Sequence, residues 1–255
     1  MFVIYPNVAV DKMSVPLNGV PGRFGVPGHL GAPAHSGISP SALENLDEDL
    51  LGSLAMVATT LHFERDAEII AQGARAEYCF HVISGCMRTV RLLEDGRRQV
   101  GEFLLAGDVF GWDAVGEHEF AAEAVTPLTL RRIRLSSIED RADEDRGFAQ
   151  RLRRYTADQV RIARARLVLL GRKTAAERIA SFLLEMVDRL NSPSEAVIEL
   201  PMSRADMADY LGLTIETVCR GLTELRRQGT IGVERTRVVI RDSRALALAG
   251  SDCLQ

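Results

Sequence analysis

The chain has little cysteine and lacks any long apolar run. Its 255 residues include only four cysteines, Cys79, Cys86, Cys219 and Cys253. Four widely spaced thiols are too few for a disulfide framework, which suits a reducing compartment. No uncharged apolar stretch reaches the roughly 18 residues that a membrane-spanning helix needs. The first residues have neither a basic n-region nor an apolar h-region, so we expect a cytoplasmic protein with no membrane partner.

Motifs for catalysis are also missing. The sequence contains no Ser-His-Asp arrangement, no cluster of metal ligands and no phosphate-cradling glycine loop at a usable spacing. We therefore expect a protein that is not an enzyme. A general surplus of positive charge is absent as well, because the net charge is −4.

That charge is distributed unevenly along the chain. Residues 1–145 hold 12 Lys and Arg against 22 Asp and Glu, whereas residues 146–170 hold seven Arg against the single Asp158. Residues 171–255 balance at 12 against 12. Because affinity for DNA depends on local basic surface, the composition permits nucleic-acid binding without predicting it.

Changes of pattern along the chain indicate four parts. Residues 1–40 are rich in Gly and Pro without a sustained period, and we interpret them as a disordered extension. Residues 41–144 begin with a capping-box pattern at Ser41 and continue as short β-runs separated by glycines, with an Asp95-Gly96 hairpin signal. This pattern predicts a small β-barrel or sandwich.

A long helix is predicted over residues 145–170, followed by a further domain over residues 171–255. The long helix offers two apolar stripes, which exceed the needs of one monomer. One stripe, with Phe148, Leu152, Tyr155 and Ile162, can cover the chain's own β domain; a single amphipathic helix serving one core is the alternative. The other stripe follows a 3-4-3 spacing suited to a two-helix seam, and its residues are the predicted dimer contacts: Val160, Ala163, Leu167 and Leu170.

Within residues 171–255, the segment from Ser203 to Arg220 is typical of two short helices joined by a tight turn. Ser203 and Asp206 have the spacing of a capping box, and Gly212 suits a turn with positive φ. Thr214 can cap the second helix. A strand over residues 196–200 precedes this segment, and two strands over 231–233 and 238–240 follow it as a hairpin. The predicted inner faces comprise Met207, Ala208, Leu211, Ile215, Val218, Leu222 and Leu225.

The outer face of the second helix then carries side chains suited to reading bases. An Arg matches guanine O6 and N7, and a Glu accepts from cytosine N4, so Glu216 and Arg220, one turn apart, can reach neighbouring base pairs. The alternative is an i,i+4 surface ion pair. The turn, cap and hairpin around the helix favour base reading. The predicted DNA-binding residues are Ser203, Arg204, Thr214, Glu216, Thr217, Cys219 and Arg220.

From residue 41 onward the chain resembles the CRP/FNR superfamily of bacterial transcription regulators, and within its FNR branch the FixK group. The matching segments are residues 169–180 after the long helix and residues 208–218 in the helix-turn-helix. The resemblance covers about four-fifths of the chain. It implies an α+β fold with a cyclic-nucleotide-type β-roll, a long dimerisation helix and a winged helix-turn-helix.

The resemblance also implies a function. A homodimer would bind a double-stranded palindrome with TTG and CAA ends, and would activate transcription through RNA polymerase, as in the control of nitrogen fixation or the response to oxygen. Family members read DNA with a Glu-x-x-Ser-Arg pattern. Glu216 and Arg220 fit that pattern, whereas Cys219 stands where the family has Ser. A thiol can still contact a thymine methyl group.

The family's known ligands do not fit this sequence, so we expect no cofactor. Residues 1–60 lack the cysteines that hold an iron–sulfur cluster, and Cys79 and Cys86 cannot supply four thiolates. Phe120 and Ala121 stand where cyclic-nucleotide binders have Arg and Ser, so a cyclic phosphate would lack partners. An effector-gated regulator with haem or another small molecule in the roll is the alternative. The candidate haem ligands are His62, His81, His118 and Met87.

Cys219 permits two interpretations. It is either a passive small residue on the reading helix or a redox brake. A thiol beside Arg220 is more easily oxidised when its pKa falls. A sulfinic or sulfonic acid there would place negative charge against DNA phosphate and weaken binding.

Overall fold

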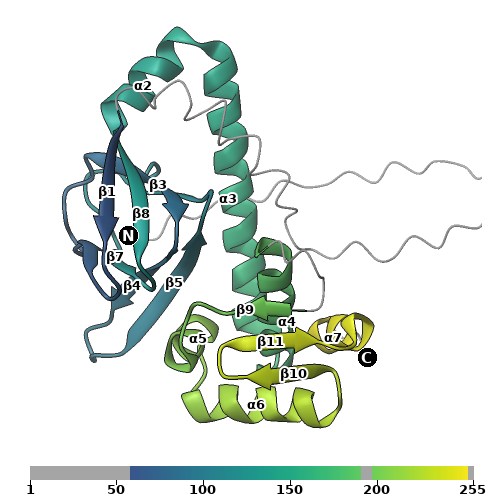
Figure 1. Cartoon of the computed structure of the whole chain (residues 1–255). Coiled ribbons are helices and arrows are strands. Elements are labelled where there is room, and N and C mark those ends of the chain that lie inside the picture. Colours follow the sequence, from purple (N-terminus) through teal and green to yellow (C-terminus); the bar gives the residue numbers. More distant parts are fainter. Residues whose placement is uncertain (1–57, 191–196, 252–255) are drawn as a thin grey trace, which may run out of the picture. The chain divides into compact units, whose positions relative to one another are not determined.

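The computed structural model describes residues 58–190 and 197–251 (Figure 1). The predicted Gly/Pro-rich extension over residues 1–40 and the helix start at Ser41 lie outside these ranges. Within them, no helix combines the length and apolar character that crossing a membrane requires. The chain is α+β, as the sequence predicts.

Two four-stranded antiparallel sheets form the β-roll of the N-terminal half. The first has the order β1-β8-β3-β6, and the second has the order β2-β7-β4-β5. Apolar side chains of both sheets, among them Phe80, Met87 and Leu130, form one buried core between them. The strands are β1 (Thr59–Phe63), β2 (Glu68–Ile70), β3 (Tyr78–Ser84), β4 (Cys86–Leu92), β5 (Arg98–Leu105), β6 (Val109–Phe110), β7 (Ala121–Ala124) and β8 (Leu128–Arg134).

Glycine allows the sharp turns between these strands. Gly96 has φ of +80° in the turn that joins β4 to β5, so the predicted Asp-Gly hairpin is confirmed. Gly85, between β3 and β4, has φ of +93°. A Cβ at Gly85 would lie 2.3 Å from the carbonyl oxygen of Pro127, so this turn requires both the positive φ and the missing side chain.

Two helices follow the roll. Helix α2 (Leu135–Glu144) was missed in the sequence, because its ten residues contain only one that is buried, Ile138. Helix α3 (Arg146–Arg172) begins with Asp145 as its N-cap, whose carboxylate accepts hydrogen bonds from the amides of Gly147 and Phe148. The predicted long helix is thus present, and it continues two residues beyond residue 170, through Gly171.

The described residues of the C-terminal part form four further helices and a three-stranded antiparallel sheet of order β10-β11-β9. The predicted hairpin is confirmed, although Glu234 belongs to its first strand rather than to the turn. The final helix, α7, was not predicted; its signal was Asp242, which caps an alanine- and leucine-rich run. The elements are α4 (Ala175–Arg189), β9 (Val197–Glu199), α5 (Arg204–Leu211), α6 (Ile215–Arg227), β10 (Ile231–Glu234), β11 (Arg237–Ile240) and α7 (Ser243–Gly250).

Candidate nucleic-acid interface

Helices α5 and α6 form the two-helix unit that the sequence predicts. Helix α5 begins with a complete capping box: the Ser203 hydroxyl accepts from the amide of Asp206, and the Asp206 carboxylate accepts from the amide of Ser203. It ends at Gly212, whose φ of +62° and ψ of 41° are left-handed. Thr214 caps α6 by accepting a hydrogen bond from the amide of Thr217. Buried side chains join the helices, so they form one packed unit.

The predicted inner faces agree with the structure except at one position. Met207, Ala208 and Leu211 of α5 are buried, as are Val218, Leu222 and Leu225 of α6. Ile215 was expected to face inward, but 46% of it is exposed. It is the first residue of α6, and a residue in the first turn extends beyond the core that the later turns contact.

The outer face of α6 presents the side chains that were predicted to read bases. Glu216, Cys219 and Arg220 are exposed, and Thr217 is half-buried. Hydrogen bonds from its own backbone amide and from the Thr214 hydroxyl lower the pKa of Glu216, so its carboxylate is charged and accepts hydrogen bonds. The charge of Arg220 also contributes to lowering the pKa of Glu216, so the two side chains interact electrostatically. Among the described residues, however, no salt bridge within 4.0 Å joins Arg220 to a carboxylate, and both side chains are exposed.

Three other predicted DNA contacts already have structural roles. The Ser203 hydroxyl donates to Asp206 Oδ2 over 2.7 Å, and the Thr214 Oγ1 lies 3.0 Å from Thr217 Oγ1. Arg204 is half-buried, and its Nη2 donates to the carbonyl of Arg235 in the β10–β11 turn over 2.9 Å. Burial lowers the pKa of Arg204. Arg204 thus fixes the hairpin against α5.

The same hairpin carries basic residues that the sequence analysis missed. Arg235 occupies the β10–β11 turn with φ of +55°, and both Arg235 and Arg237 are exposed. Two arginines around a two-residue turn were the available signal. Their guanidinium groups lie on the same hairpin whose carbonyl Arg204 holds.

The two stripes of helix α3 differ in exposure. Phe148 and Tyr155 of the first stripe are buried, and the Tyr155 hydroxyl donates to the carbonyl of Val109 in β6 over 3.1 Å. In the second stripe Val160, Ala163 and Leu167 are exposed, and Leu170 is half-buried. Leu167 is 72% exposed, and its neighbour Val168 is 51% exposed. An apolar stripe of this kind on a long helix is an unfilled packing surface.

Phe120, which the resemblance places where cyclic-nucleotide binders have a polar partner for the phosphate, is half-buried in the β-roll. The Phe120 ring lies so close to Gly101 that a Cβ at Gly101 would be 2.8 Å from Phe120 Cε1. Arg91 lies over the same ring, 5.9 Å from its centroid. The Phe120 ring thus packs between β5 and the Arg91 side chain.

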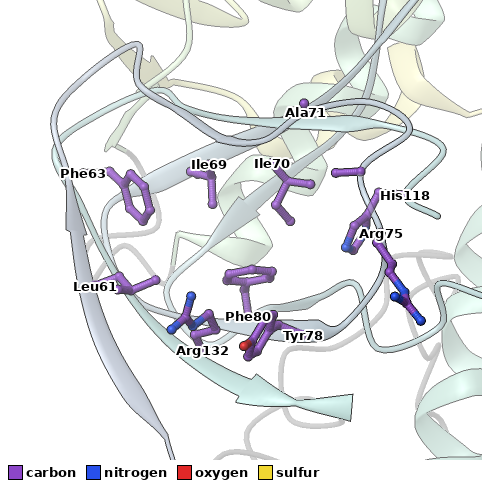
Figure 2. Close-up of a pocket in the computed structure, with 11 residues that line it drawn as sticks. Leu61, Phe63, Ile69, Ile70, Ala71, Arg75, Tyr78, Phe80, His118 and Arg132 are labelled. Carbon is purple, nitrogen blue, oxygen red and sulfur yellow. The ribbon is translucent and has the colours of Figure 1, made fainter. Parts of the chain in front are cut away.

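A cavity of about 330 Å³ opens at another part of the roll. Figure 2 shows apolar side chains of β1, β2 and β3 around it, with Arg132 beside Phe80 and Tyr78. The guanidinium of Arg132 lies 4.4 Å from the centroid of the Tyr78 ring, and within the described ranges it pairs with no carboxylate.

The candidate haem ligands are dispersed. His62 Nδ1 lies 3.2 Å from Thr129 Oγ1, His118 stacks on Phe110, and Met87 is buried in the core of the roll. His81 is buried in β3. Burial raises the pKa of both Cys79 and Cys86 to about 12, which keeps these thiols protonated and unreactive. No three His, Cys, Asp or Glu residues of the described part are grouped as metal ligands.

Comparisons with known proteins agree with this arrangement. Residues 60–145 match the family described as a cyclic nucleotide-binding domain, and residues 177–249 match the Crp-like helix-turn-helix domain. The nitrogen fixation regulation protein FixK of Azorhizobium caulinodans is 43% identical over 197 residues, which cover 76% of this chain and 79% of that protein. FixK of Rhizobium meliloti is 37% identical over 84% of this chain and 92% of that protein.

A solved structure shows the same fold. FixK2 from Bradyrhizobium japonicum has a TM-score of 0.73 and 43% identity, over 77% of this chain and 98% of that one. A β-roll, a long helix and a winged helix-turn-helix together define a class, the DNA-binding transcription regulators with a sensor-type domain. The chain belongs to the CRP/FNR family of these regulators and is similar to the FixK proteins within it. It is a transcription factor rather than an enzyme.

Proposed function

We propose that two copies of this chain pair through helix α3 and bind a palindromic duplex, one half-site to each copy. The observation that carries the proposal is the outer face of α6, where Glu216 and Arg220 are both exposed one turn apart. The exposed stripe of Val160, Ala163 and Leu167 supports pairing, and members of this family are typically dimeric. In this proposal residues 41–144 form the sensor-type domain and residues 145–170 form the dimerisation helix. Residues 171–255 form the DNA-binding domain, here called the reader.

Each predicted DNA-binding side chain then has a chemical role. Arg220 donates two hydrogen bonds to a guanine, and Glu216 accepts one from a cytosine on the neighbouring pair. Thr217 and Cys219 lie against the same groove, with the thiol near a thymine methyl group. Ser203, Arg204 and Thr214 contribute at the helix starts, where phosphate binds favourably. The target has TTG and CAA ends, as the Glu216 and Arg220 pattern of the family suggests.

The protein acts as an activator of the FixK type by contacting RNA polymerase. The support is similarity: two of the relatives are named nitrogen fixation regulation proteins, so genes of that process or of the response to oxygen are the expected targets. It requires neither an iron–sulfur cluster nor a cyclic nucleotide. The support for this is the buried state of Cys79 and Cys86, together with Phe120 and Ala121 in place of the Arg and Ser that the family resemblance would require for a cyclic phosphate.

Oxidation of Cys219 tunes the affinity for DNA. The thiol is exposed on the reading helix. Hydrogen peroxide transfers one oxygen atom to the sulfur and leaves as water, which gives a sulfenic acid. A second peroxide repeats the transfer and gives a sulfinic acid, whose ionised form adds a negative charge at the groove. We expect wild type to lose affinity after peroxide treatment while Cys219→Ser retains it. An equal loss in both proteins would exclude this role.

One observation favours a second function, a regulator gated by a small molecule in the roll. The cavity of about 330 Å³ combines apolar walls with the unpaired Arg132. An anionic ligand with an apolar body would match both. Thermal-shift measurements with haem and with small carboxylates separate the two functions, because only a gated regulator unfolds at a higher temperature with a ligand and then binds DNA more tightly.

The principal test is selection of binding sites from random DNA with the purified protein, reduced and oxidised. Recovery of a symmetric site with TTG and CAA ends supports the proposal. Recovery of sequences without symmetry would refute it.

A further inference from the structure

The β-roll holds helix α5, the first helix of the helix-turn-helix, through three polar side chains. On β4, the Arg88 Nη1 donates to Asp206 Oδ1 over 2.9 Å. On β5, the Arg98 Nη2 donates to the same oxygen over 2.8 Å, and its Nε donates to Asp209 Oδ2 over 2.8 Å. Gln99 adds a hydrogen bond of 2.6 Å from its Nε2 to the backbone carbonyl of Asp209. Four hydrogen bonds thus connect the β4–β5 hairpin to helix α5.

The contact between Arg88 and Asp206 is largely buried from solvent. The side chain of Asp206 is 5% exposed and that of Arg88 is 11% exposed. Arg88 is itself held in place, because its Nε and Nη2 both donate to Glu123 Oε2, at 2.9 and 2.7 Å. A guanidinium fixed on one side by a strand and on the other by a helix has little freedom to swing.

Asp206 uses one carboxylate oxygen to bind the β-roll and the other to cap helix α5. Its Oδ1 accepts from the two arginines, while its Oδ2 accepts from the amide and the hydroxyl of Ser203, which begins helix α5. Burial alone would raise the pKa of Asp206, but the Ser203 hydrogen bonds and the charges of Arg88 and Arg98 lower it. The Asp206 carboxylate that caps helix α5 is therefore the same group that accepts the hydrogen bonds from the β-roll.

The far end of α5 is held by aromatic packing. The Tyr210 ring lies 5.0 Å from Phe103 of β5 and 5.5 Å from Phe182 of α4. Arg166 of α3 lies over the same ring at 4.0 Å and hydrogen-bonds its hydroxyl. Helix α5 is thus fixed at both ends, and α6 is joined to it by the buried residues of the two-helix unit.

We propose that Arg88 and Arg98 are positioning residues for DNA recognition, which act through Asp206 and Asp209 to set the orientation of α6. The inference rests on the proposed function, in which two α6 helices must enter successive major grooves at a fixed separation of about 34 Å. A tilt of α5 against the roll changes that separation. The roll therefore supplies the DNA-binding geometry through built-in ion pairs, without an effector.

A charge exchange at Arg98 and Asp209 tests the proposal. These side chains are 30% exposed each, so both tolerate substitution better than Asp206. We compare Arg98→Glu, Asp209→Arg and the double variant by their affinity for the selected palindrome and for a scrambled duplex at one salt concentration. The matched control is Arg97→Glu, the same change at the neighbouring residue, whose 77% exposed side chain pairs with Asp95 in its own turn.

The proposal predicts that each single variant loses about tenfold or more in affinity for the palindrome, with little change on scrambled DNA. The double variant recovers most of the loss, and Arg97→Glu behaves as wild type. Each variant must match wild type in its circular dichroism spectrum and in the mass of its dimer. If Arg98→Glu does not fold, the affinities of Arg98→Gln and of the double variant test the proposal instead.

Equal or tighter binding to the palindrome by folded Arg98 variants would overturn the proposal, as would a double variant no better than the singles. Failure of the proposed function has a different signature, because wild type itself would then fail to distinguish the palindrome from scrambled DNA.

Discussion

The Nη1 of Arg178 donates a hydrogen bond of 2.9 Å to the backbone carbonyl of Leu211 at the end of helix α5. Its Nη2 donates to the carbonyl of Leu170 over 2.8 Å, and its Nε donates to that of Lys173 over 3.0 Å. The last carbonyls of a helix lack partners within it and carry partial negative charge. One guanidinium therefore satisfies the ends of both α3 and α5.

Replacing Arg178 is expected to destabilise the fold. Arg178→Ala leaves three carbonyls without their charged donor, and we expect a loss of about 2–3 kcal/mol in the free energy of unfolding. Arg178→Lys keeps the charge but cannot reach all three acceptors, so its loss is smaller. Urea denaturation followed by circular dichroism measures both. The exposed Arg172→Ala in the last turn of α3 is the control, and an equal loss there would contradict the assignment.

Gly85 and Gly96 provide a matched pair of turn glycines. Both have positive φ, but a Cβ at Gly85 would be 2.3 Å from the Pro127 carbonyl, whereas a Cβ at Gly96 meets nothing within 4 Å. Gly96→Ala should therefore cost only the backbone strain, about 1–2 kcal/mol. Gly85→Ala should cost about 1–3 kcal/mol more, because the carbonyl must also move. Thermal and urea unfolding of the two variants give the difference, and equal costs would show that the clash relaxes freely.

The lowered pKa of Asp206 leads us to expect that the stability of the fold depends on pH. Its pKa in the folded protein lies below its ordinary value of about 3.9. Its stabilising contribution is therefore fully present above that value and is lost as the pH falls through the folded pKa. We expect the difference in unfolding free energy between wild type and Asp206→Asn to be large at pH 7 and to shrink below about pH 4.

The control for this pH dependence is Asp143→Asn, on the exposed side of helix α2. Protein concentration is held constant, because association of two chains also affects apparent stability. A difference between wild type and Asp206→Asn that stays constant from pH 7 to pH 3 would mean that the carboxylate charge does not stabilise the fold.

Arg220 and Arg235 should differ in how they affect DNA binding. A base-reading Arg220 predicts that Arg220→Ala loses about 1–3 kcal/mol at the selected palindrome and little on scrambled DNA. Arg235, exposed in the hairpin turn, would contact phosphate, so Arg235→Ala should weaken both duplexes similarly. Fluorescence anisotropy at one salt concentration separates the two patterns. Unchanged discrimination in Arg220→Ala would remove Arg220 from the base-reading set.

The sequence predicted the features that depend on neighbouring residues. The Ser203 capping box, the left-handed Gly212 and the Asp95-Gly96 hairpin each follow from one residue or from residues at most three positions apart. The same reasoning missed helix α2, in which only Ile138 is buried, and helix α7, although the cap at Asp242 is a local signal. Ile215 was expected to face inward, but burial in the first turn of a helix depends on what packs there.

The contacts of Asp206 with the roll could not be predicted in this way. Arg88 and Arg98 precede it by 118 and 108 residues, and both looked like ordinary surface charges on a hairpin. Asp206 itself was identified only as a helix cap. Its second role depends on the packing of β4 and β5 against α5, which no local pattern encodes.

The most direct test of the account is binding to the selected palindrome before and after five base pairs are inserted between its half-sites. Half a helical turn of about 10.5 base pairs moves one half-site to the opposite face of the duplex. The account predicts two chains per intact palindrome and a fall of at least about tenfold in affinity after the insertion. Equal affinity for both duplexes, or one chain on the intact site, would contradict it.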